Sequence, residues 1–156
     1  MKKAKTAPLD FEALPGHYIR RLQQIAVAVF LQATEAHGVT PVQYAALNQV
    51  ASTPGVDQRT LARSIGLDTS TIAAVIDRLE ARGLMQRQAS PEDRRVRLLS
   101  LTAAGHELVA AIAPDVLKAQ EQMLHPLTKT ERAEFMRMLR AVVSANNELS
   151  RAPSEG

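Results

Sequence analysis

The sequence has no cysteine and no tryptophan, and only 3% of its residues are aromatic. The missing cysteines exclude disulfide bridges, thiolate zinc sites and cysteine nucleophiles. No apolar run approaches the ~18 residues that a membrane-spanning helix needs, and residues 1–8 lack the apolar stretch of a signal peptide. We therefore expect a cytoplasmic protein. We also expect a single domain, because 156 residues can bury a hydrophobic core without disulfide bridges.

Positive charge is concentrated in the middle of the chain, although the formal net charge is only +3. Residues 58–97 contain eight arginines, five acidic residues and no lysine. The planar fork of arginine suits bidentate contacts to phosphates and guanine edges, whereas the point charge of lysine does not. This distribution favours a polyanionic partner.

Apolar spacing and capping residues predict a mainly α-helical fold. Capping boxes start two helices, at Thr40 with Gln43 and at Thr128 with Glu131. Asp57 and Asp68 are suited to cap two shorter helices, which are joined by a tight turn at Gly66. The predicted helices cover residues 14–36, 41–51, 58–65, 69–82, 102–124 and 128–149.

A short β-hairpin is predicted after the fourth helix. Residues 84–87 and 96–101 have strand-like composition, and they flank a turn that contains Pro91. Two short helices joined by a glycine turn and followed by such a hairpin indicate a winged helix-turn-helix. Residues 38–101 would form this lobe.

These motifs resemble the MarR family of bacterial transcription regulators. The resemblance is carried by residues 70–84, the Ser90-Pro91-Glu92-Asp93-Arg94-Arg95 segment and Leu101-Thr102-Ala103-Ala104-Gly105. It implies a winged helix-turn-helix within an intertwined helical homodimer that binds a double-stranded DNA operator. Residues 14–37 and 102–150 would then be dimerisation helices, and residues 1–13 and 151–156 flexible tails.

The fourth predicted helix is the candidate recognition helix. Its apolar stripe leaves Ser70, Ala74, Asp77 and Ala81 on the opposite side, with Thr71 and Arg78 flanking. Ser70 and Thr71 lie in the first turn, where a recognition helix meets base edges, and Arg78 can reach a guanine or a phosphate. The alternative is a solvated face whose small residues serve helix propensity alone. Asp77 and Glu80 are expected to pair with neighbouring arginines.

The wing carries the second group of candidates, Asp93, Arg94, Arg95 and Arg97. Strand alternation would point Arg95 and Arg97 the same way, and one of them can enter a minor groove. The resemblance implies that this residue is Arg95 and that Asp93 orients it through a charge-assisted bond. The alternative is a turn with a surface ion pair of little energetic value.

A candidate effector site combines His17 and Arg21, which share one face of the first helix beside apolar residues. No acidic residue lies between Glu12 and Glu35, so this cation pair is a plausible carboxylate clamp. The resemblance adds Gln43 and Tyr44 of the second helix, and it implies an aromatic acid such as a hydroxybenzoate or hydroxynicotinate. Pairing of His17 and Arg21 with acidic residues across the dimer is the alternative.

The sequence lacks the motifs of an enzyme. The four histidines have no metal-ligand spacing, and there is no glycine-rich phosphate loop and no serine-centred elbow. We expect no cofactor and no metal site. The function expected is a DNA-binding repressor that an aromatic acid releases from a pseudo-palindromic operator. A winged-helix module that binds a protein instead of DNA is the alternative, because this fold does not dictate its partner.

Overall fold

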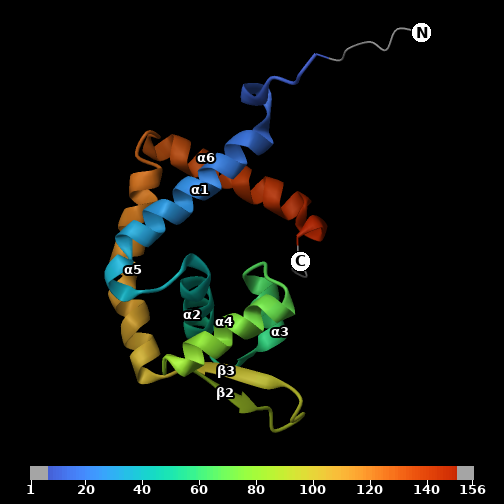
Figure 1. Ribbon diagram of the computed structural model, residues 1–156, viewed down its shortest axis with the longest axis vertical. Helices are drawn as coiled ribbons and strands as arrows, with labels where there is room; N and C mark the ends of the chain where they lie inside the picture. Colours follow the sequence, from blue (N-terminus) through green and yellow to red (C-terminus); the bar gives the residue numbers. More distant parts are fainter. Residues whose placement is uncertain (1–6, 151–156) are drawn as a thin grey trace, which may run out of the picture.

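The computed structural model describes residues 7–150 as a small α/β lobe carried by long helices. The lobe comprises α2 (Pro41–Ser52), β1 (Val56–Asp57), α3 (Gln58–Ser64), α4 (Thr69–Ala81), β2 (Met85–Ala89) and β3 (Arg97–Leu101). The long helices are α1 (Pro15–Ala33), α5 (Ala103–Met123) and α6 (Lys129–Ala145). In Figure 1, α5 rises from the wing, and α1 and α6 lie across the top of the molecule.

Local signals determine where the helices begin. Thr40 and Gln43 form the predicted capping box at α2, and Thr128 and Glu131 form the one at α6. Asp57 and Asp68 cap α3 and α4 by accepting hydrogen bonds from backbone N–H groups. These four predictions are confirmed. They could be made from the sequence because a cap needs only residues within three positions of each other.

The wing is part of a three-stranded antiparallel sheet of order β1-β3-β2. The predicted hairpin is confirmed, with Met85 opposite Leu101 and Arg87 opposite Leu99. The additional strand β1 was not predicted from the sequence. Val56 pairs with Leu99, and the Gly55 N–H donates to the Leu99 carbonyl at 2.8 Å. A two-residue strand is too short to produce a periodic pattern.

The apolar stripe predicted for α4 forms the centre of the lobe's core. Ile72, Ile76 and Leu79 are fully buried, together with Leu47 of α2 and Leu99 of β3. A second cluster joins α1 and α5 through Phe30 and Ile112, together with Val39 before α2 and Tyr44 of α2. The lobe is therefore seated on α1 and α5, and its position depends on them.

The ends of the helical arms differ from the predicted boundaries. A 3-10 turn at Phe11–Ala13 lies within the segment expected to be a tail, and the edge of the Phe11 ring contacts His17. The last helix ends at Ala145 rather than Leu149, because the Asn146 side chain caps it by donating to the Val142 carbonyl at 2.9 Å. The remaining tail residues, 1–6 and 151–156, lie outside the described part of the chain.

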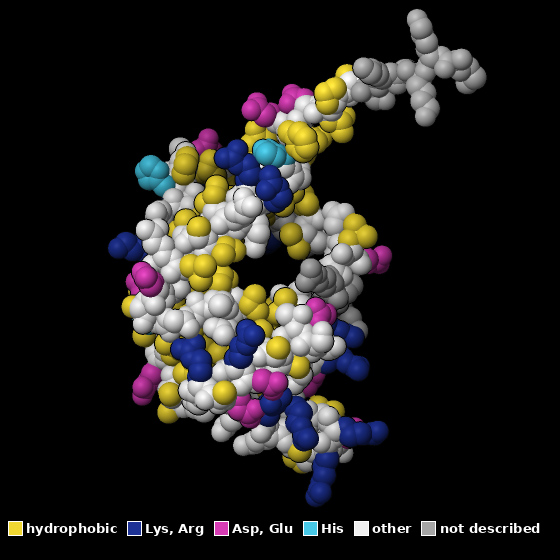
Figure 2. All heavy atoms as spheres, in the orientation of Figure 1, with side chains coloured by type: hydrophobic (Ala, Val, Ile, Leu, Met, Phe, Trp, Pro, Cys, Tyr) yellow, Lys and Arg dark blue, Asp and Glu magenta, His cyan; other side chains and the backbone are white. Residues whose placement is uncertain are grey.

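Helix α6 has apolar side chains that remain exposed to solvent. No residue of α6 is buried, and Val142 and Val143 are 56% and 67% exposed. Figure 2 shows hydrophobic side chains around an opening between the long helices and the lobe.

No helix in the described range 7–150 is long and apolar enough to cross a membrane.

Candidate nucleic-acid interface and effector site

The outward face of α4 has the predicted composition. Ser70, Ala74 and Arg78 are exposed, Thr71 is half-buried, and the opposite stripe lies in the core. Glycines with positive φ follow the ends of α3 and α4, at Gly66 (70°) and Gly83 (69°). Glycine adopts these conformations at low cost, and the two turns delimit α4, which keeps its apolar stripe in the core and its opposite face in solvent.

Asp68 organises the first turn of α4. Its Oδ1 accepts hydrogen bonds from the Ser70 hydroxyl (2.6 Å) and the Thr71 N–H (2.7 Å), and its Oδ2 accepts one from the Thr71 hydroxyl (2.7 Å). These bonds, that from Ser70 foremost, hold the pKa of the Asp68 carboxyl well below its usual range. Both hydroxyl protons are thus engaged, so Ser70 and Thr71 present oxygen lone pairs outward.

The wing turn differs in one respect from the prediction. Strand β3 begins at Arg97, and Arg95 lies in the preceding turn. The expectation that strand alternation aligns Arg95 with Arg97 is therefore wrong, because a turn residue has no pleat. Arg97 instead donates to the Arg94 carbonyl at 3.1 Å, while the Arg94 side chain is exposed.

Asp93 holds Arg95 within this turn. The Asp93 Oδ1 accepts from the backbone N–H of Arg95 at 2.9 Å and from its Nε at 3.2 Å. The Arg95 side chain is nevertheless 92% exposed, so its terminal nitrogens reach into solvent. In Figure 2 arginine side chains project from the lower right, where the wing lies. The geometry agrees with an orienting role for Asp93.

An open groove of 580 Å³ lies between the wing and the first turns of α3 and α4. Arg95 and Arg97 line one side, and Arg59 and Thr60 of α3 line the other, next to Thr69. Arg59 belongs to the basic segment 58–97 but was not among the predicted site residues. The signal was its position two residues after the Asp57 cap, in the first turn of a helix that precedes the recognition helix.

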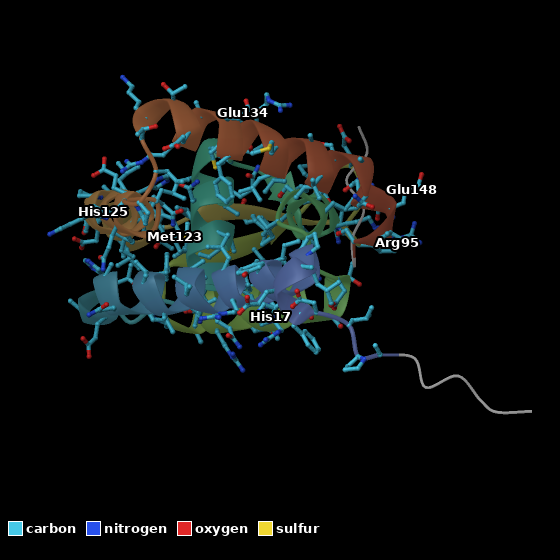
Figure 3. The ribbon with its side chains drawn as sticks, turned by 90° about the horizontal axis from the view of Figure 1, so that it is seen from above. His17, Arg95, Met123, His125, Glu134 and Glu148 are labelled. Carbon is cyan, nitrogen blue, oxygen red and sulfur yellow. The ribbon has the colours of Figure 1, made fainter. Side chains whose placement is uncertain are left out.

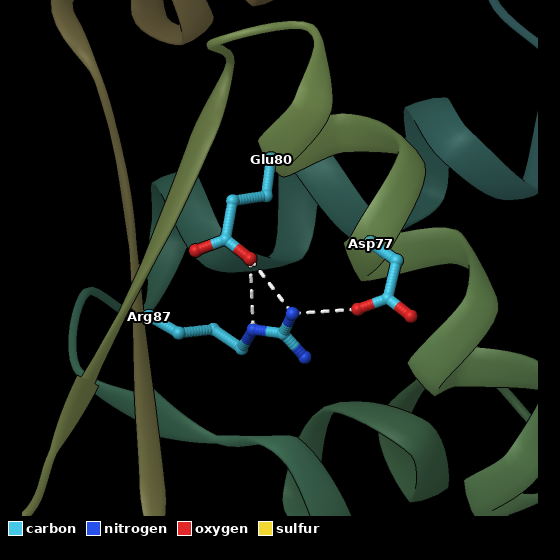
Figure 4. A network of polar contacts seen from close by, with 3 residues as sticks. All are labelled: Asp77, Glu80 and Arg87. Carbon is cyan, nitrogen blue, oxygen red and sulfur yellow. Dashed lines mark hydrogen bonds and ion pairs between the residues drawn. The ribbon is translucent and has the colours of Figure 1, made fainter.

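Arg87 joins the wing to α4 (Figure 4). Its Nε and one terminal nitrogen donate to Glu80 Oε2 at 3.0 and 2.7 Å, and the same terminal nitrogen donates to Asp77 Oδ1 at 2.5 Å. The hydrogen bond to Glu80 is the main cause that raises the pKa of Arg87. The prediction that Asp77 and Glu80 pair with a neighbouring arginine is confirmed.

The effector candidates fall into two separate groups. His17 of α1 packs edge-on against Phe11 and Tyr18, with ring centroids 5.9 and 5.3 Å apart. The Arg21 side chain is exposed and forms no hydrogen bond or ion pair with another residue in the range 7–150. Figure 3 shows His17 on the α1 side of the molecule, away from Glu134 on the α6 side.

Tyr44 and Gln43 belong to α2, and Tyr44 lies beside Phe30 near the C-terminal end of α1. The Tyr44 ring lies 5.8 Å from that of Phe30, and the Gln43 side-chain carbonyl accepts from the Thr40 N–H in the capping box. Phe30 is thirteen residues after His17, or about 20 Å along the helix. One protomer therefore does not bring Gln43 and Tyr44 together with His17 and Arg21.

A polar link that was not predicted connects α4 to the long helices. Arg82, at the C-terminal end of α4, donates to the carbonyls of Gly38 (2.8 Å) and His37 (3.3 Å). The His37 side chain in turn contacts Asp115 of α5 through Nε2 and Oδ2 at 3.0 Å. No local sequence signal indicates contacts between residues 44 to 78 positions apart.

The chain is similar in sequence to known regulators. A sequence model of the MarR family matches residues 39–96. The transcriptional regulator HosA of Escherichia coli O111:H- is 33% identical over 83% of this chain and 94% of its own length.

Solved structures agree with this assignment. The PcaV transcriptional regulator from Streptomyces coelicolor, in complex with its natural ligand, is 36% identical with a TM-score of 0.82 over 90% of this chain and 99% of that one. BpsR of Bordetella bronchiseptica, whose DNA binding is regulated by 6-hydroxynicotinic acid, is 29% identical with a TM-score of 0.83 over 87% and 97%. The chain therefore belongs to the MarR family of DNA-binding transcription regulators, which are not enzymes.

Proposed function

We propose that this regulator is a repressor, that it binds a pseudo-palindromic operator as a homodimer, and that a small aromatic carboxylate releases it. The observation that carries the DNA part is the groove in which Thr69, at the start of α4, and Arg59 of α3 lie beside Arg95 and Arg97 of the wing, next to the exposed Ser70 of α4. In this arrangement α4 enters the major groove, and Arg95 enters the flanking minor groove. Arg94, Arg97 and Arg59 then face phosphates.

Asp68 limits which bases Ser70 and Thr71 can read. Their hydroxyl protons are donated to the Asp68 carboxylate, so the free lone pairs accept hydrogen bonds. Major-groove donors are the amino groups of adenine and cytosine. We expect one of these bases opposite the first turn of α4 in each half-site, and a methyl-bearing thymine beside the small Ala74 side chain.

The proposed dimer is supported by apolar side chains that one chain leaves in solvent. Val142 and Val143 of α6 and Tyr18, Ile19 and Ile25 of α1 are all more than 45% exposed. Two-fold pairing is the commonest way to cover such faces, and it gives two recognition helices at a fixed distance. Sedimentation of a folded 17.0 kDa monomer at micromolar concentration would exclude the homodimer.

We place the effector at Arg21 and His17. The Arg21 guanidinium is available to a carboxylate, and the rings of His17, Phe11 and Tyr18 offer an aromatic surface beside it. The 6-hydroxynicotinic acid that regulates BpsR has both a carboxylate and an aromatic ring. Gln43 and Tyr44 would join this site only from the partner subunit. An aromatic ring inserted between the long helices and the lobes changes the separation of the two α4 helices in the dimer. The affinity for both half-sites of the operator then falls together.

The DNA arrangement is tested by selecting duplexes from a random library and measuring their affinity. We expect inverted half-sites about 34–36 Å apart. Ser70→Ala, Thr71→Ala or Arg78→Ala should cost ~1–3 kcal/mol on the selected site and little on other DNA, whereas Arg95→Ala should weaken binding to every duplex. If Arg95→Ala binds the selected site as tightly as the wild type does, the wing assignment is wrong.

The effector is tested by calorimetry with 6-hydroxynicotinate and 4-hydroxybenzoate, each compared with its neutral amide. Arg21→Ala should abolish the preference for the acid, and Arg20→Ala, an exposed neighbour on the same helix, is the matched control. The acid and the operator should weaken each other by the same factor, typically ~5–150-fold. Equal binding of the acid by wild type and Arg21→Ala refutes the clamp and leaves the DNA assignment intact.

A further inference from the structure

Arg87 differs from the other arginines of the wing because its guanidinium bridges two carboxylates of α4. It lies between two carboxylates of α4, with distances of 2.5 Å to Asp77 and 2.7 Å to Glu80 (Figure 4). The Arg87 side chain is 27% exposed, against 92% for Arg95. It therefore points toward the recognition helix, whereas Arg95 points into solvent.

Asp77 occupies a position that is unfavourable for a protein that binds DNA. It is 61% exposed and lies on the outward face of α4, three residues after Ala74 and next to Arg78. Duplex DNA carries one negative charge for every ~1.7 Å of its axis. A carboxylate that enters the groove with this face is repelled unless a cation compensates it.

Holding the wing in place does not require this ion cluster. The strand neighbour of Arg87 is Leu99, which is fully buried, and Met85 on the same strand is 1% exposed. Apolar packing thus already anchors the base of the wing. The two carboxylates and their single guanidinium face the exposed side of α4, where electrostatics dominates.

We infer that Arg87 is a positioning residue for DNA binding: it compensates the charges of Asp77 and Glu80 and does not itself contact DNA. With Arg87 the cluster carries one negative charge instead of two, and Arg78 beside it balances the remainder. The recognition helix can then approach phosphates despite its two acidic residues. This inference rests on the proposed DNA surface, which the experiment below tests separately.

The test measures affinity for a short mixed-sequence duplex, because repulsion by phosphates does not depend on sequence. Arg87→Gln should lower the affinity at least about tenfold at low salt, as expected for one uncompensated charge in each protomer of a dimer. Adding Asp77→Asn and Glu80→Gln to that variant should restore the affinity to within about threefold of wild type. An arginine that contacted DNA could not be replaced by removing acidic residues.

Arg95→Gln is the matched control, since it removes an exposed arginine of the same wing. It should lower the affinity and reduce the salt dependence by a slope of ~0.9 for each lost phosphate contact, and Asp77→Asn and Glu80→Gln should not restore that slope. Unchanged binding by Arg95→Gln refutes the proposed surface. If Arg95→Gln binds weakly and the triple variant remains as weak as Arg87→Gln, the surface holds and the inference about Arg87 is wrong.

A conservative variant guards against loss of folding. Arg87→Lys keeps the charge and loses the planar fork. It should bind the duplex within about threefold of wild type, with an unchanged circular dichroism spectrum. A folded Arg87→Lys variant that binds as weakly as Arg87→Gln overturns the inference, because geometry and not charge would then matter.

Discussion

Gly105 in the first turn of α5 lies against the start of the wing, and replacing it with alanine should destabilise the fold. A Cβ atom at Gly105 would lie 2.0 Å from the Leu84 carbonyl oxygen and 3.2 Å from the Leu101 Cβ. The Leu84 oxygen is a backbone atom that accepts a hydrogen bond from the Thr102 N–H at 3.2 Å. Neither backbone can move without disturbing the joint between wing and α5.

The expected magnitude follows from two opposing effects. Overpacking of a rigid site costs ~1–3 kcal/mol, and more when backbone must shift. Alanine regains up to ~1 kcal/mol of helix propensity relative to glycine. Because the contact at 2.0 Å requires a shift of more than about 1 Å, we expect a net loss of ~2 kcal/mol or more, or roughly 4–8 °C in melting temperature.

Gly16→Ala provides the control within the same chain. Gly16 lies in the first turn of α1, and its added Cβ would meet no atom within 4 Å. This variant should be neutral or more stable by up to ~1 kcal/mol. Thermal melts followed by circular dichroism at one fixed protein concentration compare the two. Gly105→Ala melting at or above the temperature of Gly16→Ala would refute the reasoning.

Three further predictions concern the cap of α4, the wing and the link to α5. The carboxyl of Asp68 has a lowered pKa in the folded state, so the stability it contributes is present above about pH 4 and lost below it; melts from pH 5 to pH 2 should show a smaller loss for Asp68→Asn than for wild type. Asp93→Ala should weaken binding to all duplexes less than Arg95→Ala does, because it frees the arginine without removing it, and anisotropy measures both. Arg82→Ala should retain the melting temperature to within a few degrees. It should reduce the factor by which effector and operator lower each other's affinity, whereas an unchanged factor would show that the contacts of Arg82 do not transmit this coupling.

Much of the fold was predictable because its signals are local. The caps at Thr40, Asp68 and Thr128 each involve residues within three positions, and the apolar stripe of α4 is a helical repeat. The pairing of Asp77 and Glu80 with an arginine followed from opposite charges on adjacent elements. The caps and the stripe arise before tertiary packing and therefore appear in the sequence, whereas the packing of β2 against α4 decides that the paired arginine is Arg87.

The features that were missed depend on tertiary structure. Strand β1 exists only because β3 offers a pairing edge at Leu99. Strand alternation was extended to Arg95, just before the predicted strand 96–101, because composition alone does not mark where the turn ends. The family resemblance grouped Gln43 and Tyr44 with His17 and Arg21, and the length of α1 keeps them apart within one protomer.

The link through Arg82 adds a physical route between the two halves of the molecule. The C-terminal end of α4 is tied to the turn that connects α1 and α2, and the His37 side chain in that turn is tied to α5. A rigid helix moves as a unit, so displacement of α5 relative to α1 changes the direction of α4 through these hydrogen bonds as well as through the Phe30 and Ile112 packing. The hydrogen bonds of Arg82 are exposed and individually weak, the His37–Asp115 contact is partly buried, and the apolar cluster is buried. The cluster therefore supports the position of the lobe, and we expect the hydrogen bonds to adjust its angle, on which the spacing of the two α4 helices in the proposed dimer depends.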